Sequence, residues 1–323
     1  MKLIIPMAGN GTRLRPHTIT TPKALVELAG KPMLAHVLDR LKSLKFSEVI
    51  LIVNEENERL KKYIEKNYGY KVSFRVQTER KGDGHAVYQA RDAFEDEPVF
   101  IMFADTLMEA NFNKLDKKSD GVIYTKEVEN PRAFGVVFEH EGHITKIIEK
   151  PETPESNKAI VGTYYFKSSK KLFESLDFVI KNNITSKGEY KMADAIQVLI
   201  DQGSLFKTAP VSVWKDCGTM ESLLDANKYL LKGMDIKTKP KTSVIIKPVS
   251  IQPGVEIKNS IIGPNVSVGR DTIIENSILQ DSIIGSDSEI NGVVLTDSII
   301  GKNARVTSKH KNLNVGDYSW TNH

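Results

Sequence analysis

PMAGNGTRLRPHTITTPKAL, residues 6–25, is a glycine-rich and basic stretch that directly follows a short apolar run at the start of the chain. Its two glycines allow backbone N–H groups to approach a phosphate closely, and Arg13 and Lys23 supply fixed positive charge. The third glycine of a dinucleotide fingerprint is missing, because Leu14 stands at its position, and the Gly-Lys-Ser/Thr of a P-loop is absent. The stretch therefore predicts a phosphate-binding loop after the first strand, with a surface loop as the alternative.

The first hundred residues around this loop alternate between two hydrophobic periods. Strands are predicted at 2–7, 48–53, 71–77 and 98–105, and helices at 32–44, 55–67 and 84–94. Such alternation predicts a mostly parallel sheet with helices on both faces. Because ligands of such sheets bind beyond the carboxyl ends of the strands, we expect the loop, Gln77 and Asp105 at one rim.

The pattern becomes richer in strands from about residue 120, which predicts a lid and a second binding half. The expected strands are 121–127, 134–139, 143–150, 159–166 and 206–214, and the expected helices are 170–180, 191–201 and 220–233.

Helical patterning disappears after residues 234–243, which contain few apolar residues and are predicted to be a linker. Beyond it, aliphatic residues recur every five or six positions, separated by Gly, Asn, Asp and Ser, and a step near six is typical of a hexapeptide β-helix. The positions are Ile251, Ile257, Ile262, Val268, Ile274, Leu279, Ile284, Ile290, Leu295, Ile300 and Val306. The sequence thus predicts a first domain over 1–233 and a β-helix over 244–323, whose tail 312–323 caps the last coil; antiparallel hairpins are the alternative.

Composition limits the class of protein. The net charge of +4, from 45 basic and 41 acidic residues, is too mild to indicate nucleic acid as the main partner. The lone Cys217 excludes an internal disulfide and fits a reducing compartment. The first apolar run is too short for a signal peptide, and no run approaches the ~20 apolar residues of a membrane span. We expect a cytoplasmic protein without nucleic-acid or membrane partners.

Residues 8–23, AGNGTRLRPHTITTPK, resemble the Gly-x-Gly-Thr-Arg-x-x-Pro-x-Thr…Pro-Lys loop of the sugar-1-phosphate nucleotidylyltransferases. The whole chain is similar to members of the glucose-1-phosphate thymidylyltransferase and UDP-glucose pyrophosphorylase type that add a C-terminal left-handed β-helix. The resemblance implies an α/β fold with a Rossmann-like, mostly parallel sheet. It also implies that Arg13 and Lys23 hold the triphosphate, and that the nucleotide is wrapped by the backbone of Ala8, Gly9, Gly11 and Thr12.

The segment QTERKGDGHAV, residues 77–87, resembles the base-binding segment of the same family. By this resemblance Gln77 pairs with the edge of a pyrimidine, because its amide both donates and accepts, and Gly82 lets the backbone approach the base. Asp83 is a polar departure from the family pattern. We expect His85 to pack near the start of a helix rather than act as a base.

Two aspartates in family motifs are implied to hold a magnesium ion. Asp105 ends the predicted strand 98–105, and Asp216 precedes a tight Cys-Gly turn. Carboxylate oxygens suit Mg²⁺, which usually takes one or two carboxylates together with substrate phosphates.

The sugar 1-phosphate site is implied by three further motifs. IIEKP, residues 147–151, resembles the family's Glu-Lys-Pro, in which Glu149 binds sugar hydroxyls and Lys150 binds the sugar phosphate. GEYKMADAI, residues 188–196, resembles Gly-Glu-x-x-x-Thr-Asp, in which Glu189 is a further sugar contact. The remaining expected contacts are backbone contacts at Gly135 and Gly162.

The implied reaction is transfer of a nucleoside monophosphate from an NTP to a hexose 1-phosphate, with UTP or dTTP and glucose 1-phosphate favoured. Ala24 stands where thymidylyl-transferring relatives carry Gln, and the length and β-helix are also similar to those of mannose-1-phosphate guanylyltransferases. Two rival hypotheses are a bifunctional acetyltransferase and a non-catalytic regulatory subunit. The acetyltransferase usually needs a histidine, but 244–306 contain none and His310 lies just beyond. The β-helix is expected to form a homo-oligomer through its flat faces and open ends.

Overall fold

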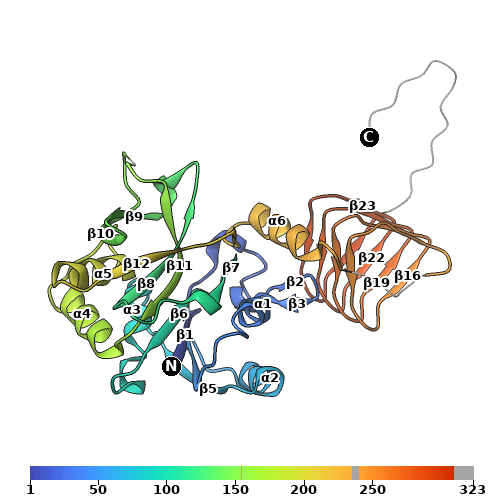
Figure 1. Cartoon of the computed structure of the whole chain (residues 1–323). Coiled ribbons are helices and arrows are strands. Elements are labelled where there is room, and N and C mark those ends of the chain that lie inside the picture. The colour runs from blue at the N-terminus through green and yellow to red at the C-terminus, as the bar shows by residue number, and fades with distance from the viewer. Residues whose placement is uncertain (154, 235–239, 309–323) are drawn as a thin grey trace. The chain divides into compact units, whose positions relative to one another are not determined.

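A computed structural model describes residues 1–153, 155–234 and 240–308 (Figure 1). His310, the tail 312–323 and the middle of the expected linker lie outside the described residues. The chain forms two compact units. The first comprises Met1–Val26 and Pro32–Ser222, and the second comprises Glu27–Lys31 and the chain from Leu223 onward. The domain boundaries at 233 and 244 stay predictions.

Unit 1 is built on a nine-stranded mixed sheet. Its main path runs β10-β9-β11-β6-β1-β4-β5, and β8 joins β11 to β12. Neighbours are parallel from β6 through β1 and β4 to β5, whereas β11 is antiparallel to β6, β8 and β9. The strands are β1 Lys2–Pro6, β4 Glu48–Val53, β5 Lys71–Val76, β6 Val99–Met102, β8 Gly121–Glu127, β9 Gly135–His140, β10 His143–Glu149, β11 Lys158–Phe166 and β12 Phe206–Pro210.

Helices cover both faces of this sheet. Successive side chains of a strand point to opposite faces, so an entirely apolar strand contributes to a core on each side. Leu3 and Ile5 of β1 pack in one core with α1 and α2, and Ile4 packs in the other with α3, α4 and α5. The helices are α1 Met33–Arg40, α2 Glu58–Tyr68, α3 Asp83–Tyr88, α4 Ser169–Lys181 and α5 Met192–Asp201. The expected parallel sheet with two covered faces is confirmed for this part of the chain.

Two expected elements differ from the structure. The strand expected over 206–214 is two strands, β12 and β13 (Val213–Asp216), because β12 pairs with β8 while β13 pairs with β7 (Thr106–Glu109). The helix expected over 84–94 ends early. Backbone N–H groups beyond α3 bond three residues back, from Gln89 to Ala86 and from Ala90 to Val87, so the chain tightens into 3₁₀ geometry.

Unit 2 contains a β-helix of three parallel sheets, the arrangement expected for a left-handed β-helix. The sheets run β14-β17-β20-β23, β15-β18-β21-β24 and β16-β19-β22-β25. All eleven aliphatic positions of the repeat lie in its buried core or pack against it, so the predicted periodicity is confirmed. The strands are β14 Val244–Ile245, β15 Val249–Ile251, β16 Glu256–Lys258, β17 Ile261–Ile262, β18 Val266–Val268, β19 Ile273–Glu275, β20 Ile278–Leu279, β21 Ile283–Ile284, β22 Glu289–Asn291, β23 Val294–Leu295, β24 Ile299–Ile300 and β25 Arg305–Thr307.

Residues Glu27–Lys31 of a hairpin from early in the sequence also belong to unit 2. The hairpin is made by β2 (Glu27–Leu28) and β3 (Lys31–Pro32), and the backbone N–H of Ala29 donates to Oδ1 of Asn227 on α6 (Met220–Leu231) at 2.9 Å. The same oxygen accepts from Ser267 of β18 at 2.6 Å. The buried Asn227 therefore joins the hairpin, α6 and the β-helix.

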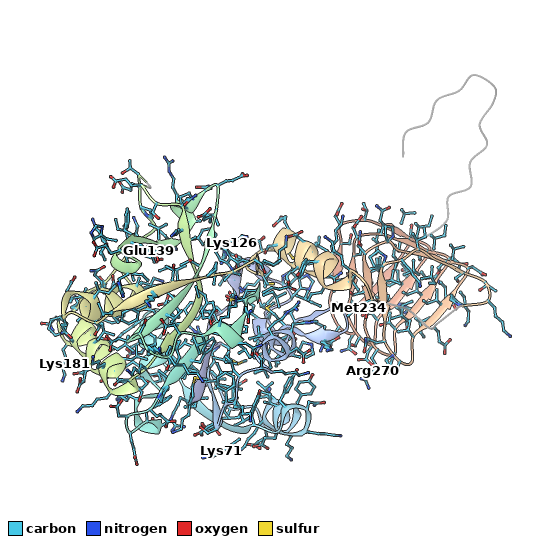
Figure 2. All side chains as sticks on the ribbon, in the orientation of Figure 1. Lys71, Lys126, Glu139, Lys181, Met234 and Arg270 are labelled. Carbon is cyan, nitrogen blue, oxygen red and sulfur yellow. The ribbon has the colours of Figure 1, made fainter. Side chains whose placement is uncertain are left out.

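Several charged side chains lie on the periphery of the units. Figure 2 shows Lys71 and Lys181 at the edge of unit 1 and Arg270 at the edge of unit 2. Within the described residues, no helix is both long and apolar enough to cross a membrane.

Candidate active site

The glycine-rich loop is closed by a local hydrogen bond. The hydroxyl of Thr18 donates to the carbonyl of Gly11 at 2.7 Å. Gly11 has a φ of 58°, and a Cβ there would lie 2.9 Å from the Thr18 methyl group, so only glycine fits without strain. A Cβ at Gly9 would meet nothing within 4 Å. Packing therefore accounts for Gly11, whereas Gly9 leaves open space at the cavity.

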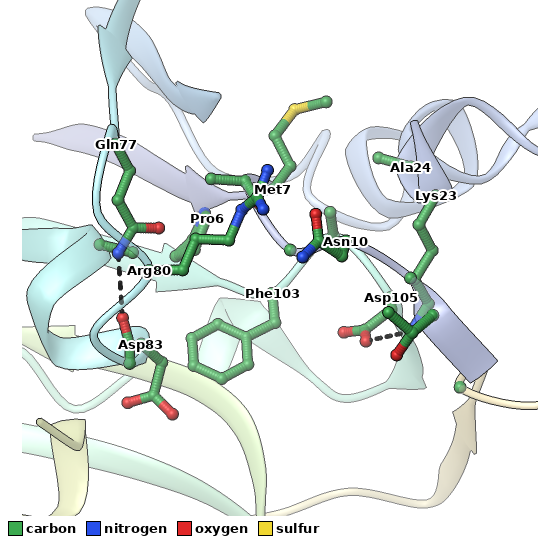
Figure 3. Close-up of a pocket in the computed structure, with 18 of the residues that line it drawn as sticks. Pro6, Met7, Asn10, Lys23, Ala24, Gln77, Arg80, Asp83, Phe103 and Asp105 are labelled. Atoms are coloured by element: carbon green, nitrogen blue, oxygen red, sulfur yellow. Dashed lines mark hydrogen bonds and ion pairs between the residues drawn. The ribbon is translucent and has the colours of Figure 1, made fainter. Parts of the chain in front are cut away.

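A cavity of about 570 Å³ lies beyond the carboxyl ends of β1, β5 and β6 (Figure 3). The structure brings together ten of the residues expected to bind substrate or metal. They are Ala8, Gly9, Gly11, Thr12, Arg13, Lys23, Gln77, Gly82, Asp105 and Glu189. Three segments distant in sequence thus meet at one rim; the role of each residue stays a prediction.

At one end of this cavity the Gln77 amide is held by two contacts. Nε2 of Gln77 donates to the carbonyl of Gly82 at 3.2 Å and lies 3.1 Å from Nδ1 of His85. Gly82 has a φ of 115°, and a Cβ there would lie 2.3 Å from the carbonyl oxygen of Tyr190. Since the amide nitrogen is committed to these partners, Oε1 of Gln77 is left as the acceptor on the cavity side (Figure 3).

A second cavity of about 370 Å³ adjoins the first. It is lined by Gly135, Glu149, Lys150 and Gly162, which are four of the five residues expected to bind the sugar phosphate. The fifth, Glu189, lines the first cavity. The two cavities share Arg13, Asp83, Phe103, Asp105 and Lys191.

Two glycines let the walls of the second cavity come close together. A Cβ on Gly135 would lie 2.8 Å from Oε2 of Glu149, its partner across the β9–β10 ladder. Gly162 has a φ of 76°, and a Cβ there would lie 2.8 Å from the Phe103 ring. Burial, and then the nearby carboxylate of Asp83, raises the pKa of Glu149. Glu149 is therefore an acceptor in a confined and acidic part of the cavity.

Asp105 and Asp216 form a pair of neighbouring carboxylates. Asp105 follows β6, Asp216 ends β13, and the N–H of Cys217 donates to the carbonyl of Asp105 at 3.1 Å. Burial first, and then Asp105, raises the pKa of Asp216, whereas Lys23 and Arg13 oppose this shift. The described residues contain no group of three or more His, Cys, Asp or Glu side chains able to hold a metal. Two hard oxygen donors still fit a divalent cation whose other ligands come from phosphates.

The residues shared by the two cavities are only partly marked in the sequence. Motifs assign Arg13 and Asp105, but nothing in the sequence pattern singles out Phe103 or Lys191. Asp83 is visible in the sequence only as a polar departure. Sequence reasoning also misses Arg80, which lines the first cavity and donates from Nε to the carbonyl of Ala8 at 3.1 Å. No spacing signal marks these side chains, because the fold alone brings them to the rim.

Comparisons with known proteins identify the family and the fold. The family described as "Nucleotidyl transferase" matches residues 2–233. A "Bifunctional protein GlmU" of Methanocaldococcus jannaschii is 38% identical over 250 residues, which are 76% of this chain and 59% of that protein. The chain therefore spans less than two-thirds of that relative.

A second relative and a solved structure cover nearly all of their own length. A "UTP--glucose-1-phosphate uridylyltransferase AglF" of Haloferax volcanii is 32% identical over 240 residues, covering 71% of this chain and 96% of that protein. The crystal structure of a UDP-glucose pyrophosphorylase complexed with UDP-glucose has a TM-score of 0.62 and 23% identity, and covers 72% of this chain and 99% of that one. The solved structure shows the fold shared by the two proteins.

Proposed function

The chain belongs to the nucleotidyl transferase family, and we propose that it transfers a nucleoside monophosphate from an NTP to a hexose 1-phosphate, with release of pyrophosphate. The observation that carries this proposal is the pair of adjoining cavities that share Arg13 and Asp105. The first cavity suits the nucleotide and the second suits the sugar phosphate. Both substrates would therefore reach the guanidinium of Arg13 and the carboxylate of Asp105.

In this reaction an oxygen of the sugar 1-phosphate attacks the α-phosphorus of the NTP, and the bond to the bridging oxygen of pyrophosphate breaks. The nucleophile is already an anion, so catalysis depends on positioning and on charge stabilisation. We propose that Arg13 and Lys23 neutralise the triphosphate and the leaving pyrophosphate, and that Lys150 holds the attacking phosphate. Asp105 and Asp216 would hold a divalent cation, which we propose is Mg²⁺. When bound, it supplies charge neutralisation for the phosphates.

The orientation of Gln77 favours a base that presents an N–H. With Nε2 bonded to Gly82, Oε1 accepts from the cavity side. Uracil and thymine carry an N–H donor at N3, whereas cytosine has an acceptor there. We therefore propose UTP or dTTP as the nucleotide and glucose 1-phosphate as the sugar, in keeping with the uridylyltransferase relative. GTP with mannose 1-phosphate is the second combination, because guanine also presents an N–H.

We further propose that the β-helix assembles copies of the chain. In the sheet β14-β17-β20-β23 the side chains of Val244, Ile261, Ile278 and Val294 stand in register and are 55%, 36%, 43% and 74% exposed. Such a row of exposed aliphatic side chains favours burial against another surface.

The proposed reaction is tested by measuring pyrophosphate release with a panel of NTPs and sugar 1-phosphates. We expect UTP or dTTP with glucose 1-phosphate to give the highest kcat/KM. A protein that releases no pyrophosphate with any pair in the presence of Mg²⁺ would overturn the proposal. Acetyl-CoA turnover with glucosamine 1-phosphate, measured in parallel, tests the bifunctional hypothesis.

A further inference from the structure

Asp83 and Lys191 form an ion pair at the junction of the two cavities. Nζ of Lys191 lies 3.4 Å from Oδ2 of Asp83, and both side chains line both cavities. They come from segments that are more than a hundred residues apart, the start of α3 and the residue before α5. The expected sugar and metal residues do not include them.

The backbone holds these two segments against each other. Tyr190 N–H donates to the carbonyl of Lys81 at 2.8 Å, and Gly84 N–H donates to the carbonyl of Tyr190 at 3.0 Å. Oδ1 of Asp83 accepts from the N–H of Met192 at 2.7 Å, so it also caps the start of α5. These hydrogen bonds therefore fix the position of the ion pair.

The surroundings of Lys191 are acidic. Burial lowers the pKa of Lys191, but the carboxylates of Asp83, Glu189 and Glu149 together raise it above its ordinary value. Glu189 also pairs directly with the ammonium. One ammonium among three carboxylates disfavours a phosphate at this point. It suits hydroxyl groups, which can donate to a carboxylate and accept from an ammonium.

Resting on the proposed function, we propose that the Asp83–Lys191 pair selects the sugar by binding a hydroxyl of the hexose ring of the sugar 1-phosphate. An ammonium has three donors. Two face Asp83 and Glu189, which leaves the third for the sugar hydroxyl. Asp83 positions this donor, and its charge keeps the ammonium in place. The Asp83–Lys191 pair then determines which hexose is accepted, while Lys150 and the cation proposed at Asp105 and Asp216 act on the phosphates.

The test compares two variants that separate this role from a structural one. Asp83→Asn keeps an oxygen that can accept from Met192 N–H but removes the charge facing Lys191. Lys191→Met keeps the length of the side chain but removes the ammonium. Lys81→Met is the matched control, because Lys81 lies in the same turn, is 54% exposed and lines neither cavity.

Each protein is assayed with glucose 1-phosphate and with its 2-, 3-, 4- and 6-deoxy analogues. For the wild type, we expect one analogue to lose roughly tenfold or more in kcat/KM, because a charged group then lacks its partner. Both variants and the double variant should abolish this one penalty and keep the others. The KM of the NTP should change by less than about twofold, a small change by comparison with the tenfold effect on the sugar. The Lys81→Met protein should behave as the wild type.

The proposal is overturned if the wild type discriminates against none of the analogues, or if the variants retain every penalty. It is also overturned if, in the Asp83→Asn or Lys191→Met protein, the KM of the NTP rises as much as the KM of the sugar phosphate. If Asp83→Asn does not fold, Lys191→Met carries the test. If the wild type transfers no nucleotide at all, the proposed function fails separately. Calorimetry then compares binding of glucose 1-phosphate to the wild type and to Lys191→Met, and equal affinities would refute the role of the pair.

Discussion

Nζ of Lys23 lies 2.5 Å from Oδ2 of Asp105, which ties the far end of the glycine-rich loop to the carboxyl end of β6 (Figure 3). The two residues are 82 positions apart in the sequence. The ammonium therefore lies next to one of the two carboxylates proposed to hold a divalent cation. Its charge can act on the same phosphates as the cation.

Replacing Lys23 should harm the chemical step more than substrate binding. We expect Lys23→Met to lower kcat by roughly 10²–10³, the cost of removing one charge-stabilising donor of a transition state. Lys31→Met is the control, since Lys31 is an exposed lysine that lines neither cavity. Steady-state pyrophosphate release measures both variants. A Lys23→Met protein with wild-type kcat and a raised KM would assign Lys23 to ground-state binding alone.

The carboxylate pair should be needed both for turnover and for binding of a divalent cation. We expect Asp105→Asn and Asp216→Asn each to lower pyrophosphate release by at least about 10². Each should also weaken binding of Mn²⁺, used as a spectroscopic probe in the presence of NTP. Thermal unfolding of each variant provides the folding control. Near-normal turnover in either variant would contradict the metal assignment.

The sequence predicts the fold where local pattern and tertiary packing agree. The apolar run 49–53 of β4 is buried. The five- or six-residue aliphatic step marks the coils of the β-helix because each coil repeats one local geometry. The β2–β3 hairpin escapes prediction, because its strands are two residues long and its turn is held by a distant partner, Asn227. The sequence pattern does not distinguish β13 from β12, because the two strands differ only in their partners: β12 pairs with β8 and β13 pairs with β7.

The candidate site is predictable only where a motif names the residue. Arg13, Lys23 and Asp105 lie in such motifs, and the structure brings them to one cavity. The ion pair of Asp83 with Lys191 could not be predicted, since neither residue is near the other in the sequence. Their proximity depends on how residues 81–84 bond to 190–192.

NTP binding should weaken at acidic pH through His85. Burial first, and then the charge of Lys81, lowers the pKa of His85 below its ordinary value of 6.5; Glu79 opposes this shift and Arg91 adds to it. At neutral pH Nδ1 can therefore accept from the Gln77 amide. As pH falls through the lowered pKa, both ring nitrogens become donors and the amide loses this acceptor.

We expect the KM of the NTP to rise as the pH falls below 6.5 through the lowered pKa of His85, and to stay constant at and above neutral pH, where the imidazole is neutral. The pKa of His85 is lower in the folded state than the unfolded value of 6.5. Its contribution to the free energy of unfolding is therefore fully present above pH 6.5 and is lost as the pH falls through the folded pKa. A His85→Asn protein should lose this pH dependence of KM, whereas His140→Asn, at an exposed site, should retain it. An acid rise of KM that persists in His85→Asn would assign it to another group.

The aliphatic row of the β-helix should control self-association. Ile278 lies in the middle of the row, 43% exposed, between Ile261 and Val294 in register. Its outward position predicts that Ile278→Glu leaves the core of the coils intact and adds a charge that cannot be buried without a partner. We expect light scattering to show an oligomer for the wild type and a smaller species for Ile278→Glu, with similar thermal unfolding. Glu256→Lys, a charge change at an exposed position of the β16 sheet, is the control and should leave the oligomer unchanged. A wild type that is monomeric at working concentration would exclude assembly through this row. An oligomer unaffected by Ile278→Glu would place the assembly surface elsewhere.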